Sequence, residues 1–195
     1  MSRTRHSQAA FGLLEVILVF ALVIGAGAIV FSVFQSANRR SAASLTVDKV
    51  HTLVANVQGS SVASVGQRSV LNTTSAKQAH LLTPGLETNG WGGVIEVADN
   101  TTYATPVFQV VIRNVPRDAC ADLVTGLLTN RSMIRTMMSV PGTKTTDLPF
   151  TGIAVASPQS KAATYTFTMN QCSSAAVVGN TVDFGIYYSY TGGLQ

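Results

Sequence analysis

Residues 11–19 read Phe11-Gly12-Leu13-Leu14-Glu15-Val16-Ile17-Leu18-Val19, and they open an apolar run that extends to Phe34. Glu15 is the only charged residue in this run, and Ser32 is the only polar residue after it. At about 1.5 Å per residue, a helix from Val16 to Phe34 is just long enough to cross a hydrocarbon core. A carboxylate in such a helix costs a few kcal/mol, so we expect Glu15 to have a specific role.

A short basic leader, Met1 to Ala10, precedes this run and contains Arg3 and Arg5 but no acidic residue. Such a leader is typical of a cytoplasmic flank. Secretory cleavage could use the small residues Ala26-Gly27-Ala28, but apolar residues continue beyond them and a carboxylate is unusual in a signal peptide. An uncleaved single-pass anchor is a second alternative.

A glutamate four residues after Phe11, behind a basic leader, resembles the N-terminal signature of type IV pilins. In that family a prepilin peptidase cuts before an apolar residue, and glutamate is the fifth residue of the mature protein. The resemblance implies cleavage between Ala10 and Phe11, methylation of Phe11 and an assembly role for Glu15. Glycine usually precedes the cut, whereas alanine stands here. Cleavage after Gly12 would restore the glycine but make Glu15 the third mature residue.

Beyond the apolar run, a helical apolar stripe continues through Leu45, Val50, Leu53, Val54 and Val57. We therefore expect the N-terminal helix to continue to about Gly59, with one face packed on a sheet. The expected organisation is a leader at 1–10, a membrane-spanning or filament-core helix at 11–38, an amphipathic helix at 39–60 and a globular domain at 61–195.

The globular region contains strand-like runs at 94–97, 107–112, 165–169 and 182–188, and a short helix is expected at about 75–82. A further helix is expected to start with Pro116 at its first position, with an apolar stripe formed by Cys120, Leu123, Val124, Leu127 and Leu128. This order predicts an α+β fold, in which a long hydrophobic N-terminal helix packs on a mostly antiparallel β-sheet.

Cys120 and Cys172 are the two cysteines of the chain. Their spacing does not indicate a metal or redox motif, and in an exported domain the expected state is a disulfide. Closing a loop of about fifty residues stabilises the fold by about 4 kcal/mol in the chain-entropy model. A half-cystine on a short helix after a strand is similar to the pattern of type IVb major pilins, which form conjugative thin pili and bundle-forming pili.

Composition and motifs argue against other classes of protein. The histidines at 6, 51 and 80 adjoin no nucleophile motif, and the Gly-rich residues 90–93 lack the Lys-Ser/Thr of a phosphate loop. Basic residues are scattered, so no nucleic-acid site is evident. We expect neither an enzyme nor a metal or cofactor site.

The resemblance therefore implies a structural subunit, most like a type IVb major pilin. It would be held in the bacterial inner membrane as a precursor and then polymerise into an extracellular fimbrium for adhesion, self-association or conjugative mating-pair contact. Its partners would be copies of itself, the prepilin peptidase and the inner-membrane assembly machinery. Alternatives are a minor pilin or type II secretion pseudopilin, and a membrane-anchored periplasmic binding domain that does not polymerise.

Overall fold

The structure is a computed structural model, and it describes residues 6–60, 71–100, 107–130, 132–138, 153–156, 172 and 180–190. The chain divides into two compact units, Met1–Arg39 and Arg40–Gln195. Helix α1 (His6–Gly59) supplies the described residues of the first unit and the start of the second. Within the second unit, residues 60–195 follow α1, and we call these residues the head unit.

In the described residues, α1 is the one helix that is long and apolar enough to cross a membrane. Gly25 and Gly27 interrupt its apolar run, but a Cβ atom added at either position meets nothing within 4 Å. In membrane helices such glycines commonly serve close packing between helices. Among the described residues, Gly25 and Gly27 have no packing partner.

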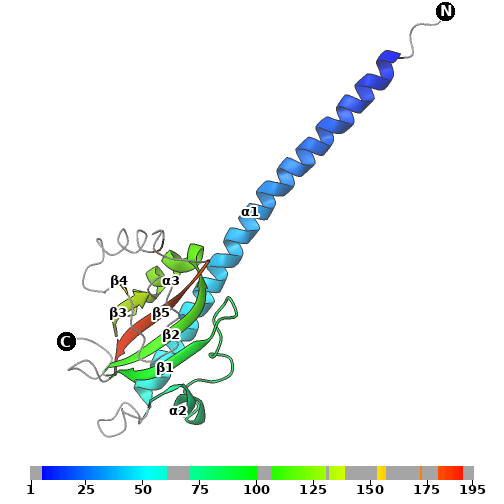
Figure 1. Ribbon diagram of the computed structural model, residues 1–195. Coiled ribbons are helices and arrows are strands. Elements are labelled where there is room, and N and C mark those ends of the chain that lie inside the picture. Colours follow the sequence, from blue (N-terminus) through cyan, green and yellow to red (C-terminus); the bar gives the residue numbers. More distant parts are fainter. Residues whose placement is uncertain are drawn as a thin grey trace, which may run out of the picture. The chain divides into compact units, whose positions relative to one another are not determined.

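The head unit contains a five-stranded sheet with the order β1-β2-β5-β3-β4, and all its described strand pairs are antiparallel (Figure 1). This confirms the α+β fold with an antiparallel sheet. The described elements of the head unit are α2 (Thr73–Gln78), β1 (Ile95–Asn100), β2 (Val107–Pro116), the 3-10 helix η3 (Arg117–Ala119), α3 (Cys120–Leu127), β3 (Met133–Met138), β4 (Ile153–Ala156) and β5 (Thr181–Ser189).

One face of the sheet forms the core with α1. Phe108 pairs with Tyr188, and the rings stack with centroids 5.6 Å apart. The expected apolar stripe of α1 is buried in the same cluster at Val50, Leu53, Val54 and Val57, but the prediction is wrong for Leu45, which is 49% exposed. The helix therefore packs on the sheet as predicted, because residues three and four apart share one helix face.

Two element boundaries differ from the sequence predictions. The short helix expected at 75–82 is α2, which begins earlier because Asn72 caps it: its side chain accepts a hydrogen bond from the Ser75 amide. Pro116 is not the first residue of an α-helix. It ends β2 and precedes η3, and α3 begins only at Cys120.

The sheet also contains two strands that the sequence patterns did not indicate, β3 and β4. The strand expected at 165–169 lies outside the described residues. The expected runs at 94–97, 107–112 and 182–188 correspond to β1, β2 and β5, with shifted ends. The helix end expected near Gly59 is confirmed.

Residues outside the sheet cover the outer edge of β1. The amides of Ile95, Val97 and Asp99 donate, respectively, to the Glu87 carbonyl (2.8 Å), the Thr73 hydroxyl (3.2 Å) and the Leu71 carbonyl (2.7 Å). These three alternate amides face away from β2. The edge of the sheet is therefore closed by the chain itself at β1.

Candidate functional site: the N-terminal helix and its attachment to the head unit

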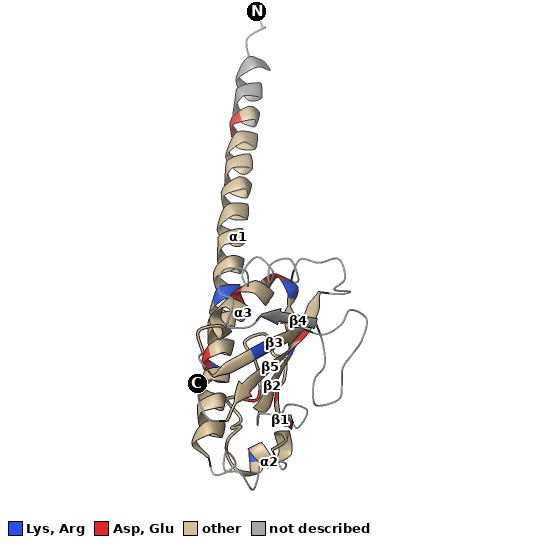
Figure 2. Cartoon of the chain, turned by 90° about the vertical axis from the view of Figure 1, so that its left-hand side faces the viewer, with Lys and Arg blue, Asp and Glu red and all other residues tan. Residues whose placement is uncertain are grey.

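The first part of α1, which precedes Arg39, exposes a continuous apolar surface between Leu14 and Phe34. Apart from Glu15, its side chains are uncharged, as the tan ribbon in Figure 2 shows. The large apolar side chains here are 53–69% exposed; they are Leu14, Val16, Ile17, Leu18, Val19, Phe20, Leu22, Val23, Ile24, Ile29, Val30, Phe31, Val33 and Phe34. Such a surface needs lipid or apolar protein around it.

The residues expected to act in processing and assembly all lie on this part of α1. Ala10 and Phe11 are helical, and Glu15 follows one turn later with an exposed side chain. Ser32, the other polar residue of the span, donates its hydroxyl hydrogen bond to the Ile29 carbonyl at 2.8 Å. Because the helix itself satisfies Ser32, this residue is tolerated in a bilayer, whereas Glu15 has a charge to neutralise.

Side chains of α1 attach the helix to the head unit by hydrogen bonds to backbone atoms. Lys49 donates to the Thr88 carbonyl (2.8 Å), Asn56 donates to the Leu81 carbonyl (3.1 Å), and Gln58 donates to the Ser189 carbonyl (2.6 Å). Thr46 accepts a hydrogen bond from the Gly90 amide at 2.9 Å. These contacts connect successive turns of α1 to the segment 81–90 and to the end of β5.

Residues 89–93, Asn89-Gly90-Trp91-Gly92-Gly93, form a turn that we call the Asn89 turn. The Asn89 Oδ1 atom accepts hydrogen bonds from the Trp91 and Gly93 amides, each at 2.9 Å. Its Nδ2 atom donates to the Arg113 carbonyl at 2.6 Å. Asn89 is buried, and Trp91 is partly buried against the core. A single amide side chain therefore organises the turn that faces α1.

Glycines allow the close approach of the turn and of α3 to the helix. A Cβ atom at Gly90 would overlap the Ala42 backbone, and one at Gly126 in α3 would lie 2.7 Å from the Val47 Cγ2 atom. A methyl group at Gly90 requires the two backbones to separate, whereas a methyl group at Gly126 requires the Val47 side chain to move. The sequence at these positions thus determines how tightly α1 is held.

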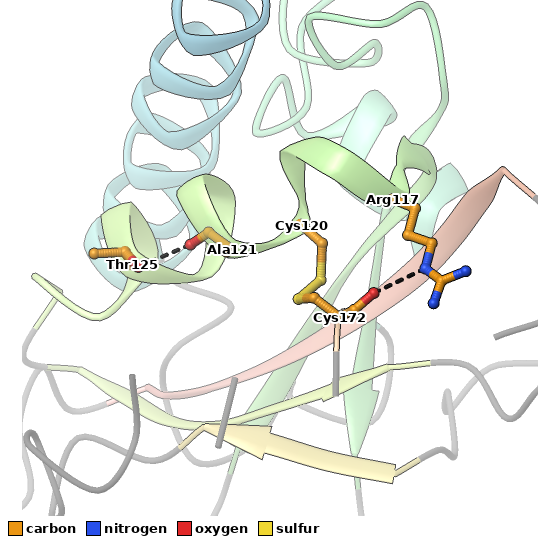
Figure 3. Close-up of a disulfide and its surroundings, with 5 residues drawn as sticks. All are labelled: Arg117, Cys120, Ala121, Thr125 and Cys172. Carbon is orange, nitrogen blue, oxygen red and sulfur yellow. Dashed lines mark hydrogen bonds between the residues drawn. A yellow bond between two sulfur atoms is a disulfide. The ribbon is translucent and has the colours of Figure 1, made fainter. Parts of the chain in front are cut away.

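The expected disulfide between Cys120 and Cys172 is present, with Cα atoms 5.9 Å apart (Figure 3). Cys120 is the first residue of α3 and is fully buried with the apolar face of that helix. The Arg117 Nε atom donates to the Cys172 carbonyl at 2.9 Å. The bridge fastens Cys172 to the start of α3, across a sequence separation of 52 residues.

Arg113 joins the strands beside the Asn89 turn. Its Nε atom lies 2.8 Å from a Glu96 carboxylate oxygen on β1, and its Nη1 atom lies 3.1 Å from Asp183 on β5. Burial alone would lower the pKa of Arg113, but hydrogen bonds and attraction from the two carboxylates outweigh it and raise this pKa. Arg113 therefore stays charged and connects three strands.

A partly buried histidine, His51, and a fully buried tyrosine, Tyr188, have side-chain polar atoms without a hydrogen-bond partner among the described residues. Burial lowers the pKa of His51, and the nearby Asp48 carboxylate partly offsets this effect; the Nε2 atom of His51 finds no hydrogen-bond partner in the described ranges. The hydroxyl of Tyr188 is fully buried with no partner in the described part of the chain, and burial raises its pKa. The described residues contain no group of three or more His, Cys, Asp or Glu residues that could hold a metal.

These features define a class: a subunit with an exposed, membrane-competent N-terminal helix whose C-terminal half packs on a disulfide-bonded antiparallel sheet. The protein-family model described as PilS N terminal matches residues 40–176, which is more than half of the chain. The chain therefore belongs to the PilS N-terminal family of type IV pilins, of the type IVb, thin-pilus class. Pilins are structural proteins rather than enzymes, and the resemblance seen in the sequence is confirmed.

Among solved structures, the chain is similar to TcpA, a type IV pilin from Vibrio cholerae El Tor biotype. The identity is 13%, the TM-score is 0.46, and the match covers 77% of this chain and 97% of TcpA. A comparison with curated protein sequences finds no match.

The family match does not include residues 1–39, so it does not test the roles expected of Ala10, Phe11 and Glu15. Sequence reasoning missed Thr46 and Asn89. The Asn-Gly dipeptide was a signal for the turn, but the contact of that turn with Thr46 follows only from the packing of α1.

Proposed function

We propose that this chain is the structural subunit of a type IV pilus and that the first part of α1 forms the core of the polymer. The exposed apolar surface between Leu14 and Phe34 carries the proposal. Each large apolar side chain that leaves water for apolar contact contributes about 1.5–3 kcal/mol. A bilayer satisfies this surface in the precursor, and neighbouring helices satisfy it in the filament.

In this proposal, the prepilin peptidase removes the leader 1–10 by cutting between Ala10 and Phe11, and Phe11 becomes the methylated N-terminus. Residues 11–38 form the membrane-spanning and filament-core helix, residues 39–60 form the amphipathic half, and 61–195 form the globular domain. The precursor resides in the bacterial inner membrane until the assembly machinery there transfers it to the extracellular pilus. The filament then serves adhesion, self-association or conjugative mating-pair contact.

Glu15 acts in this proposal as the residue that sets the register between subunits. Its carboxylate neutralises the N-terminal amine of Phe11 of a neighbouring subunit. Each charge alone is costly in a dry apolar core, and the pair is tolerated because the two charges compensate each other. Subunits that are out of register leave both charges unpaired, so the pair selects one arrangement.

The test replaces Glu15 with alanine and compares filament yield with that of the parent chain, each expressed as the only pilin. We expect normal membrane insertion and an intact disulfide in Glu15→Ala, but a sharp loss of sheared filaments. The unpaired Phe11 amine would cost about 3–5 kcal/mol per subunit. N-terminal analysis of the same membrane preparations should find Phe11 as the first residue.

Ser32→Ala is the matched control, because it removes the other polar side chain of the span, which the helix already satisfies. It should assemble normally. Filaments from Glu15→Ala at the parent yield would remove the assembly role of Glu15. A parent chain that itself forms no filaments would instead favour a membrane-anchored domain that does not polymerise.

A further inference from the structure

The dipeptide Asn89-Gly90 brings a chemically reactive pair of groups together at the surface of α1. Asparagine is among the less durable residues of proteins. In an Asn-Gly pair, the glycine nitrogen can bond to the asparagine Cγ atom because no side chain on glycine hinders its approach. Because the pair is reactive, the contacts of Asn89 and Gly90 determine how fast this reaction proceeds.

The reaction has two steps and requires only water. The Gly90 nitrogen forms a bond to Cγ of Asn89 and loses its proton, while the Cγ–Nδ2 bond breaks and the nitrogen leaves as ammonia. The product is a succinimide ring. Water then adds to one of the two ring carbonyls and opens the ring to aspartate or to isoaspartate, in which the main chain runs through the side chain. No atom is oxidised or reduced.

The folded structure activates the electrophile of this reaction, which is the side-chain carbonyl carbon of Asn89. Two backbone amides, those of Trp91 and Gly93, donate to the Oδ1 atom of Asn89 at 2.9 Å each. Paired backbone donors on a carbonyl oxygen stabilise the negative charge that develops when a nucleophile adds to the carbon. The Asn89 turn therefore polarises the group that the Gly90 nitrogen would attack.

The nucleophile, which is the Gly90 nitrogen, is by contrast held in place by α1. The Gly90 amide donates its proton to the Thr46 Oγ1 atom at 2.9 Å, and the Thr46 hydroxyl in turn donates to the Ala42 carbonyl at 2.7 Å. Thr46 is fully buried, so water does not compete for its oxygen. The leaving nitrogen is also held, because Nδ2 donates to the Arg113 carbonyl at 2.6 Å.

We propose that Asn89-Gly90 is a deamidation site that Thr46 protects, so that the reaction proceeds only when α1 is not packed on the Asn89 turn. The product cannot restore the native turn. An aspartate at position 89 would place a carboxylate oxygen beside the Arg113 carbonyl, and it would bury a charge at a position only 4% exposed. Deamidation thus permanently marks a subunit whose helix was once released from the head unit.

The test uses the full chain in detergent micelles at mildly alkaline pH. Mass spectrometry follows conversion of Asn89 in the tryptic peptide from Gln78 to Arg113, which also contains Asn100 as an internal comparison. The parent chain is incubated folded and in urea, beside Thr46→Val, Thr46→Ser and Thr52→Val. Thr52 is the matched control, since it is an exposed threonine of α1 whose hydroxyl donates only to the Asp48 carbonyl of its own helix.

We expect slow conversion in the folded parent chain and fast conversion in urea. Loss of one hydrogen bond should make Thr46→Val about five- to tenfold faster than the parent chain. Thr46→Ser and Thr52→Val should match the parent chain, and Asn100 should not respond to any of the substitutions.

Two results would overturn the proposal. One is conversion of the folded parent chain as fast as in urea. The other is a folded Thr46→Val chain that converts at the parent rate. If Trp91 fluorescence shows that Thr46→Val is unfolded, Thr46→Ala decides in the same way, because it also lacks the hydroxyl but introduces no new branched group.

Discussion

The unpaired hydroxyl of Tyr188 allows a prediction with an unusual sign. The ring is fully buried and stacked on Phe108, and the hydroxyl finds no hydrogen-bond partner in the described part of the chain. An unsatisfied buried polar group costs about 1–3 kcal/mol. Tyr188→Phe keeps the ring and removes the hydroxyl, so we expect the free energy of unfolding to rise by about 1 kcal/mol after allowance for the small void.

Tyr190→Phe is the matched comparison, because it removes the same atom from a tyrosine that uses it. The Tyr190 hydroxyl donates to an Asp99 carboxylate oxygen at 2.9 Å. Hydrogen bonds to charged groups are worth about 1.5–3 kcal/mol, and partial exposure reduces this value. We expect Tyr190→Phe to lower the free energy of unfolding by about 1 kcal/mol or more.

Urea unfolding of the full chain in detergent micelles measures both changes, with Trp91, the only tryptophan, as the fluorescent reporter. For a domain of this size, 1 kcal/mol also corresponds to a shift in Tm of about 2–4 °C. Only variants with an unchanged urea m-value are compared. If Tyr188→Phe destabilises the head unit as much as Tyr190→Phe, the Tyr188 hydroxyl has a partner and the reasoning fails.

Two further predictions concern the disulfide and pH. Replacing Cys120 and Cys172 together with serine should lower the free energy of unfolding by about 4 kcal/mol, and thiol labelling of the denatured, unreduced parent chain should find no free thiol; two labelled thiols would contradict the bridge. Burial lowers the pKa of His51 below its ordinary value of 6.5, so the unfolded chain takes up a proton at a higher pH than the folded chain. The free energy of unfolding should therefore fall as the pH drops below about 6.5. His51→Gln should flatten this decline in urea unfolding series, and an unchanged slope would exclude His51 as its source.

Much of the architecture could be predicted because its signals are local. The stripe that continues α1 to Gly59 repeats at helical spacing, and the burial of Cys120, Leu123, Val124 and Leu127 follows from the same periodicity in α3. The identities of Phe11 and Glu15 indicated the family before the head unit was considered. Such local patterns can be interpreted without knowing which distant segments contact each other in the fold.

The features that sequence reasoning missed depend on contacts between distant segments. Strand β3 contains three methionines and Arg135, which do not indicate a strand, and it is stabilised by pairing with β5 about fifty residues later. Pro116 has the fixed φ that suits a helix start, yet it ends β2 because it pairs with Thr181. The hydrogen bond from Asn89 to the Arg113 carbonyl likewise spans 24 residues.

The closed edge of β1 has a consequence for the proposed association of this chain with copies of itself. Open strand edges invite pairing with any other strand, and crowding of many identical chains makes such pairing more frequent. At β1, the Thr73 hydroxyl and the Glu87 and Leu71 carbonyls already occupy the amides that a foreign strand would need. Addition of a further strand is therefore blocked at this edge, and attraction between chains there must come from side chains. The arrangement of side chains can discriminate one partner from another, whereas backbone hydrogen bonds between strands cannot.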